Sequence, residues 1–191
     1  GAAETILELN RRLEPHKEPG NFLPFHDLMA LFRKYDVLVG AAHPYRVGGH
    51  IPQLPEEELR ELDFLDLNGK DVAENRSRAE QLTCSLGRLL GRPVVAGSDT
   101  HQAVQYGCVA TVFPEDIRDI HELYRQMKAG AYHIDISGQA AFQVKTAGIL
   151  KRALKEIHAL GGDYVEILTG TSGRKEKLNS SPSCDRLKAV I

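Results

Sequence analysis

The chain has 191 residues, with 24 Lys and Arg, 26 Asp and Glu, and a formal net charge of −2. A typical domain has about 150 residues, so this length fits one domain, or one domain with a tail. Hydrophobic residues make up 42% of the sequence, which excludes a disordered chain. The near-neutral balance excludes the strongly basic surface of a dedicated nucleic-acid binder. We therefore expect no strong nucleic-acid binding. No apolar run reaches the roughly 18 residues of a membrane-spanning helix, so we also expect no membrane partner.

Three scattered cysteines, Cys84, Cys108 and Cys184, are odd in number and lack CxxC spacing. This pattern argues against a disulfide framework and against a cysteine zinc site, and it fits a reducing compartment. Residues 1–20 carry charged residues and prolines where the apolar stretch of a signal peptide would lie. We therefore expect a cytoplasmic protein. Because the chain does not begin with Met, we also expect it to be part of a longer protein.

Helix-like and strand-like segments alternate from the start of the chain. Residues 4–13 form a short amphipathic pattern, and prolines with a glycine mark residues 15–24 as a loop. From Phe25 to Phe32 apolar residues recur at the helical period. Residues 37–42 then form a continuous apolar run without alternation, which is typical of a strand buried on both faces of a parallel sheet.

The same alternation continues through the middle of the chain. Pro55, followed by three glutamates, opens a further short helix. The pattern predicts strands over 63–67, 93–97 and 108–113, a short strand over 132–136, and helices over 73–90, 116–129 and 139–160. Gly91 and Gly130 stand where two of these helices should stop. Strands separated by helices indicate βαβ units and a parallel sheet.

The composition changes along the last third of the chain. Residues 1–137 carry the α/β pattern and form the main predicted domain. Residues 138–168 are predicted to be a carboxyl-terminal helix and a short strand at Tyr164–Leu168. Residues 169–191 are rich in Gly, Ser and Lys and are predicted to be a flexible tail.

Polar groups able to bind a metal or an anion follow three of the predicted strands. The first strand is followed by His43-Pro44-Tyr45-Arg46, the second by Asn68-Gly69, and the third by Ser98-Asp99-Thr100-His101. The carboxyl ends of parallel strands meet at one edge of a sheet, and function is located at that edge in such folds. The opposite strand ends carry no comparable groups. This asymmetry predicts a catalytic edge.

The residue types at this edge favour a transition metal. Asp99 and His101 are two residues apart and project to one side of an extended chain. Imidazole and carboxylate together suit Zn, Mn or Fe, and two such metals can bind one phosphate and generate hydroxide. The guanidinium of Arg46 could then bind the remaining phosphate oxygens in a bidentate manner. The alternatives are a simple turn at His43 and a helix cap at Asp99, while His50 is an outside candidate for a ligand.

Two segments at these positions are similar to motifs of the PHP (polymerase and histidinol phosphatase) family. Ala42-His43-Pro44-Tyr45-Arg46 resembles the third motif of the family, and Ala96-Gly97-Ser98-Asp99-Thr100-His101 resembles the fourth. Between them, residues 63–69 resemble the acidic-hydrophobic strand that ends in Asn, and residues 75–79 resemble the helix after it. Residues 106–132 resemble the end of stand-alone members. The resemblance covers about residues 25–137.

This resemblance implies a distorted (β/α)7 TIM-like barrel, a cluster of two or three metal ions, and hydrolysis of phosphoesters. Carried over, His43, Asp99 and His101 would be metal ligands, Arg46 a phosphate contact, and Asn68 a residue that supports the ligands. The first motif of the family, His-x-His, occurs nowhere in the sequence. We therefore expect the carboxyl-terminal portion of such a barrel, without its amino-terminal strands, and little hydrolase activity from this chain alone.

The expected partners follow from this interpretation. The substrate would be a phosphorylated small molecule or a nucleotide, and the metal would bind weakly because part of its surroundings is absent. Part of a barrel has an unpaired strand edge, so we also expect self-association through that edge. The alternative is a non-catalytic assembly or regulatory module derived from a PHP domain. A polymerase-associated nuclease is disfavoured because basic runs with interleaved aromatic residues are lacking.

Overall fold

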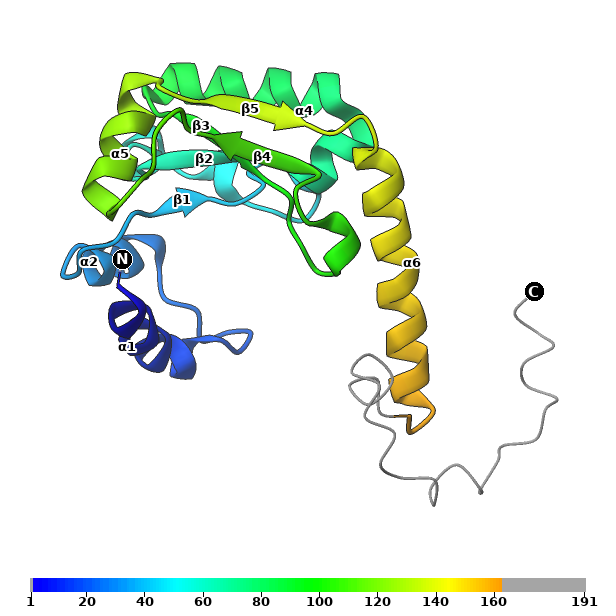
Figure 1. Ribbon diagram of the computed structural model, residues 1–191. Helices are drawn as coiled ribbons and strands as arrows, with labels where there is room; N and C mark the ends of the chain where they lie inside the picture. The colour runs from blue at the N-terminus through cyan, green and yellow to red at the C-terminus, as the bar shows by residue number, and fades with distance from the viewer. Residues whose placement is uncertain (1, 163–191) are drawn as a thin grey trace, which may run out of the picture. The chain divides into compact units, whose positions relative to one another are not determined.

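The structure is a computed structural model that describes residues 2–162 (Figure 1). Helices and strands alternate along most of it, as the sequence predicts. In chain order the elements are α1 (Ala3–Leu13), η1 (Glu14–His16), α2 (Phe25–Phe32), β1 (Gly40–Ala41), η2 (Ile51–Gln53), α3 (Glu56–Leu59), β2 (Phe64–Asn68), α4 (Gly69–Leu90), β3 (Val94–Gly97), η3 (Ala103–Gln105), β4 (Val109–Val112), α5 (Ile120–Ala129), β5 (His133–Ile136) and α6 (Ala140–Ala159).

The strands form two small sheets. β1, β2 and β3 make a parallel sheet in that order, with Leu65 opposite Val94 and Asn68 opposite Gly97. β4 pairs with β5 in an antiparallel sheet, and β4 lies next to β3, where the Thr111 hydroxyl bridges the N–H and C=O of Ala96. The mixed α/β class is confirmed. Among the described residues the strands do not close into a barrel.

The expectation of an all-parallel arrangement is wrong for β5. In a βαβ unit the helix lies along the sheet and returns the chain to the end from which the first strand started. Here α5 lies at the end of β4 instead (Figure 1). The chain therefore enters β5 near the point where β4 stops, and β5 runs back along it with Val112 opposite His133. The Tyr132 hydroxyl donates to the Val94 carbonyl at 2.8 Å and fixes this reversal.

The first predicted strand is shorter than the apolar run 37–42. Only Gly40 and Ala41 pair with β2. The N–H of Val39 is bound by the side chain of Asp63, at 2.8 Å from Oδ2, while the Val39 carbonyl accepts from the Asp63 N–H. A side chain thus replaces the strand partner, and regular pairing begins one residue later. At Gly40 a side chain would collide with the Phe64 ring, which lies over it.

The main core lies between β2 and the long helix α4. Leu65 and Leu67 alternate with Phe64, Asp66 and Asn68 along β2 and are both almost fully buried. Leu65 packs with Leu86 and Leu90 of α4, and Leu67 packs with Val72 at the start of that helix. The opposite side of β2 carries Phe64, Asp66 and Asn68 because side chains alternate along a strand. Because α4 covers the other side of β2, Asp66 and Asn68 are free to take part in the predicted catalytic edge at the carboxyl ends of the parallel strands.

Two helices begin at residues other than those predicted from the sequence, because side-chain caps determine where they start. The predicted helix 73–90 begins at Gly69, because the Asn68 side chain accepts the N–H of Lys70 at 3.0 Å and caps α4 directly after β2. The predicted helix 116–129 begins at Ile120, because Asp119 caps it by accepting the N–H of Glu122 at 2.8 Å. Both helices end at the predicted glycines, Gly91 and Gly130, in left-handed conformation.

The chain divides into two compact units, and the boundary falls inside α6 between Ala147 and Gly148. All the residues discussed below belong to the first unit. The predicted strand at Tyr164–Leu168 and the predicted tail 169–191 lie outside the described residues. Within residues 2–162, none of the helices combines the length and the apolar character needed to cross a membrane.

Candidate functional site

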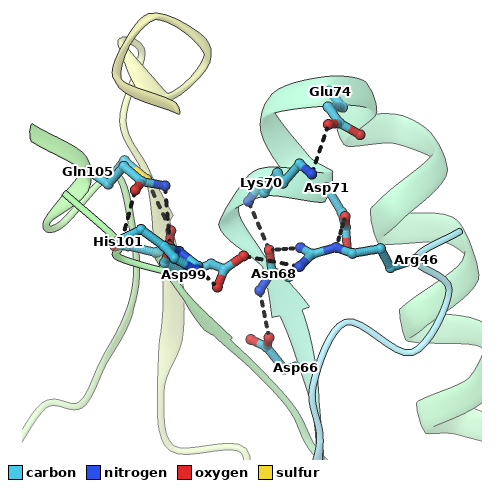
Figure 2. Close-up of polar contacts among 11 residues, drawn as sticks. Arg46, Asp66, Asn68, Lys70, Asp71, Glu74, Asp99, His101 and Gln105 are labelled. Atoms are coloured by element: carbon cyan, nitrogen blue, oxygen red, sulfur yellow. Dashed lines mark hydrogen bonds and ion pairs between the residues drawn. The ribbon is translucent and has the colours of Figure 1, made fainter. Parts of the chain in front are cut away.

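Arg46 is the centre of a polar network at the carboxyl ends of β1, β2 and β3 (Figure 2). Its Nε donates to Asp71 Oδ1 at 3.1 Å, its Nη1 donates to Asp99 Oδ2 at 3.1 Å, and its Nη2 donates to Asn68 Oδ1. These acceptors come from three different segments, so one guanidinium ties the loop after β1 to the ends of β2 and β3 and to the start of α4. The Arg46 side chain is 23% exposed, which limits solvent screening of its ion pairs.

Asn68 has two structural roles in this network. It is buried, with 4% of its surface exposed. Its Oδ1 accepts from both Arg46 and the Lys70 N–H, and its Nδ2 donates to Asp66 Oδ2 at 3.1 Å. The backbone beside it is tightly packed, because a side chain at Gly69 would lie 2.9 Å from the Ser98 carbonyl oxygen. Asn68 therefore caps α4 and orients the charged side chains on either side of it.

Asp66 is a carboxylate whose environment favours the neutral form. Burial raises its pKa above the usual value, and the nearby charge of Asp99 acts in the same direction. The hydrogen bonds from the Asn68 side chain and from the His43 N–H act against this rise. The same contributions indicate that Asp66 lies between the His43 loop and the Asp99 loop. A cation at this edge would offset the cost of ionising Asp66.

His43 and Asp99 share an unusual backbone conformation. They are the two non-glycine residues with positive φ among residues 2–162, at 37° and 52°. This region is sparsely populated by residues with a side chain, although Asn, Asp and His are enriched there. Such conformations cost of order 1–3 kcal/mol each and cluster at functional sites. Each lies two residues after the last residue of a strand of the parallel sheet, and the resemblance described above predicts both as metal ligands.

His101 is oriented by the loop that carries Asp99. Its Nδ1 lies 2.9 Å from the Asp99 carbonyl oxygen and 3.7 Å from Asp99 Oδ1. In the tautomer that donates to this carbonyl, Nε2 carries the lone pair, as in metal-binding histidines whose other nitrogen is held by a hydrogen bond. Gln105 is buried and stabilises the loop: its Oε1 accepts the His101 N–H at 2.9 Å, and its Nε2 donates to the Asp99 carbonyl at 3.3 Å.

The donor chemistry of the edge fits a divalent cation as part of a larger ligand set. Two carboxylates, Asp71 and Asp99, pair with the guanidinium of Arg46, which leaves an excess of negative charge. In the described part of the chain, however, no group of three or more His, Cys, Asp or Glu side chains is arranged to hold a metal. The assignment of His43, Asp99 and His101 as ligands therefore stays a prediction.

Some of the site residues predicted from the sequence are directly bonded to one another in the structure, and others are not. Arg46, Asn68 and Asp99 are directly bonded, and His101 contacts Asp99. His43 joins them through its backbone contact with Asp66. His50 lies outside the network: its ring is exposed and shares a 3.3 Å hydrogen bond with Gln53.

Sequence reasoning missed Asp66, Asp71 and Gln105. Asp66 carried a signal, because it stands two residues before Asn68 in β2 and so faces the same side of the sheet. Asp71 carried no signal, because the predicted helix began at residue 73 and its contact with Arg46 requires α4 to begin at Gly69. Gln105 had no signal, because its contacts depend on how the loop after Asp99 folds.

One family model matches the chain in this region. Residues 78–132 match the model described as PHP-associated, which is consistent with the carboxyl-terminal region of the PHP family and confirms the resemblance seen in the sequence. The matched stretch runs from α4 to the start of β5. It includes Asp99 and His101 but not His43 or Arg46.

A solved structure has a similar fold. The crystal structure of PsfC from Pseudomonas syringae PB-5123 aligns with 81% of this chain at a TM-score of 0.60 and 20% sequence identity. The chain spans 59% of the length of that protein. No curated protein matches the chain. At this identity the likeness to PsfC concerns the fold alone.

Proposed function

We propose that the chain is the carboxyl-terminal part of a PHP-type barrel whose complete form is a metal-dependent phosphoesterase. The observation that carries this proposal is the polar edge, where Asp71 and Asp99 pair with Arg46 and where His43 and Asp99 are held in left-handed conformation. Backbone strain at two residues of metal-binding type, one after β1 and one after β3, is typical of a functional site. The PHP-associated match over residues 78–132 supports the same interpretation.

The barrel interpretation draws on the shape of the sheet. β1 pairs with β2 on one side, and no described strand pairs with its other side. A barrel would need further strands to continue the sheet from β1. The chain also spans 59% of PsfC, so the proposal assigns the remaining strands and metal ligands to chain beyond this sequence.

Each residue of the edge would have a distinct task. His43, Asp99 and His101 would hold the metal, which when bound would supply an activated water for attack on phosphorus. Arg46 has five N–H donors, and its three side-chain bonds leave two to bind phosphate oxygens. Asn68 and Asp71 would keep the guanidinium in place. Zn, Mn or Fe fits the mixture of imidazole and carboxylate, and the substrate would be a phosphorylated small molecule or a nucleotide.

Elemental analysis and calorimetric titration with Mn²⁺ or Zn²⁺ test this proposal on the 191-residue chain. We expect weak binding that is abolished in Asp99→Ala and reduced in His43→Ala. His121→Ala is the matched control, because His121 is exposed and pairs with Asp36 away from this edge. We expect turnover of a phosphate ester close to background, since part of the ligand set is missing. Metal binding that is indifferent to Asp99 and His43 would contradict the proposal.

A second candidate function is a non-catalytic assembly or regulatory module, and the edge of β1 that no described strand pairs with favours it. An open pocket of about 570 Å³ is lined by Leu38, which precedes β1, and by residues from β2 to α5 that include Phe64 and Val95. An unpaired strand edge and an open apolar pocket are both sites for association with another chain. We therefore propose that the chain self-associates. Size-exclusion chromatography with light scattering should give a mass above the monomer, and a clean monomer over a wide concentration range would contradict it.

A further inference from the structure

A pocket of about 350 Å³ lies next to Arg46, on the side away from Asp99. It is formed by the loop after β1 and by the first half of α4. The residues that line it are Tyr45, Arg46, Val47, Lys70, Asp71, Glu74, Asn75, Arg78, Ala79 and Leu82. Its volume is at the lower end of the range of small-molecule sites, about 300–1,000 Å³. A ligand of this pocket is therefore small.

The charges in the pocket do not cancel. Arg46 is paired with Asp71 at 3.1 Å, and Lys70 is paired with Glu74 at 3.7 Å (Figure 2). Within residues 2–162 the guanidinium of Arg78 has neither an ion pair nor a hydrogen bond. The pocket therefore has one cation in excess.

A break in α4 explains why Arg78 lacks a partner. Glu74 stands four residues before Arg78, a spacing that forms an ion pair on a regular helix. Asn75 is not helical, with φ −157° and ψ 88°, and its side chain accepts the N–H of Arg78 at 3.1 Å. The break separates Glu74 from Arg78. On the uninterrupted part of the helix, Arg76 pairs normally with Glu80 at 2.8 Å.

The rest of the lining is apolar and accessible. Tyr45 is 37% exposed and Val47 is fully exposed, although both are large hydrophobic side chains. They stand opposite Ala79 and Leu82, which are partly buried on α4. Exposed apolar side chains next to an unpaired cation match a ligand that has an apolar body and one negative charge.

We propose that this pocket binds a small organic anion, with its phosphoryl or carboxyl group on Arg78 and its apolar body between Tyr45 and α4. Because Arg46 lines both the pocket and the polar edge, the pocket would receive the organic part of a substrate that reacts at the edge. That role rests on the proposed function, whereas the binding itself does not. The substrate class is then an ester that carries a second anionic group beside an apolar or aromatic portion.

Phenylphosphonate is a suitable probe because its carbon–phosphorus bond is not a phosphoester and the compound is not consumed. Ligand-observed NMR titration of the full chain, without metal, measures its affinity. We expect it to bind at least about fivefold more tightly than methylphosphonate, which lacks the ring, and than benzyl alcohol, which lacks the charge. Benzoate distinguishes the two anionic groups: tighter binding than phenylphosphonate assigns a carboxyl group to Arg78, and weaker binding assigns a phosphoryl group.

Arg78→Gln should weaken phenylphosphonate binding at least about fivefold. Arg76→Gln is the matched control, since it makes the same change of charge two residues away, at an arginine that pairs outside the pocket. Equal affinities in the two variants would overturn the proposal, as would equal binding of methylphosphonate. Arg78→Gln should leave the Mn²⁺ titration unchanged, so a failure of the metal proposal and a failure of this one give different results.

Discussion

Replacing Asn68 with Ala tests whether the polar edge is a single cooperative unit. The change removes the cap of α4, which costs about 1 kcal/mol at a typical helix start. It also removes the amide that donates to the partly buried Asp66 and accepts from Arg46. Leaving such groups without a partner costs about 1–3 kcal/mol. The expected loss of unfolding free energy is therefore about 2–4 kcal/mol.

Urea denaturation followed by helical circular dichroism measures this loss. The midpoint should fall while the slope of the transition stays the same, because the change is one of stability and not of the surface exposed on unfolding. Asp119→Ala is the matched control: Asp119 caps α5 by accepting the N–H of Glu122, and none of its side-chain contacts in the described structure reaches the polar edge. If Asn68→Ala and Asp119→Ala lower the midpoint equally, Asn68 is an ordinary helix cap, and the reasoning about the network is refuted.

Two further changes test the surroundings of this residue. The raised pKa of Asp66 means that its folded form holds a proton more tightly than the unfolded chain, so stability falls as pH rises through the folded-state pKa. Asp66→Asn should therefore gain urea stability relative to the parent chain as the pH rises above the ordinary carboxyl range, and a pH-independent difference would contradict this. Gly69→Ala places a methyl group against the Ser98 backbone and should cost about 1–3 kcal/mol. A methyl group at Gly138 meets open space, so Gly138→Ala should leave the melting temperature nearly unchanged. Thermal melts of both variants test this, and equal melting temperatures would argue against a close approach of Gly69 to the Ser98 backbone.

The sequence predicted the parts of the fold that depend on local chemistry. Gly91 and Gly130 end helices because each adopts a left-handed conformation that other residues avoid. The apolar runs placed β2, β3 and β4 to within one residue at either end. The direction of β5 was not accessible, because it depends on where α5 packs after β4 and not on the residues of β5 itself.

The candidate site shows the same division. The positions of Arg46, Asn68 and Asp99 followed from the rule that parallel strands present their carboxyl ends at one edge. The pairing of Arg46 with Asp71 could not be predicted, because it requires α4 to begin at Gly69 with Asn68 as its cap. The positive φ of His43 and Asp99 was also invisible in the sequence. That conformation now gives the strongest reason to treat these residues as functional.

The most direct measurement of the central claim is paramagnetic broadening of the backbone amide signals by Mn²⁺ added below stoichiometry to the isotope-labelled chain. A cation held at the polar edge should first broaden the signals of His43, Asp99 and His101. The signals around His121 and His133, which are exposed histidines elsewhere in the chain, should keep their intensity. Uniform broadening, or broadening that begins at the exposed histidines, would contradict a metal site at the ends of β1 and β3.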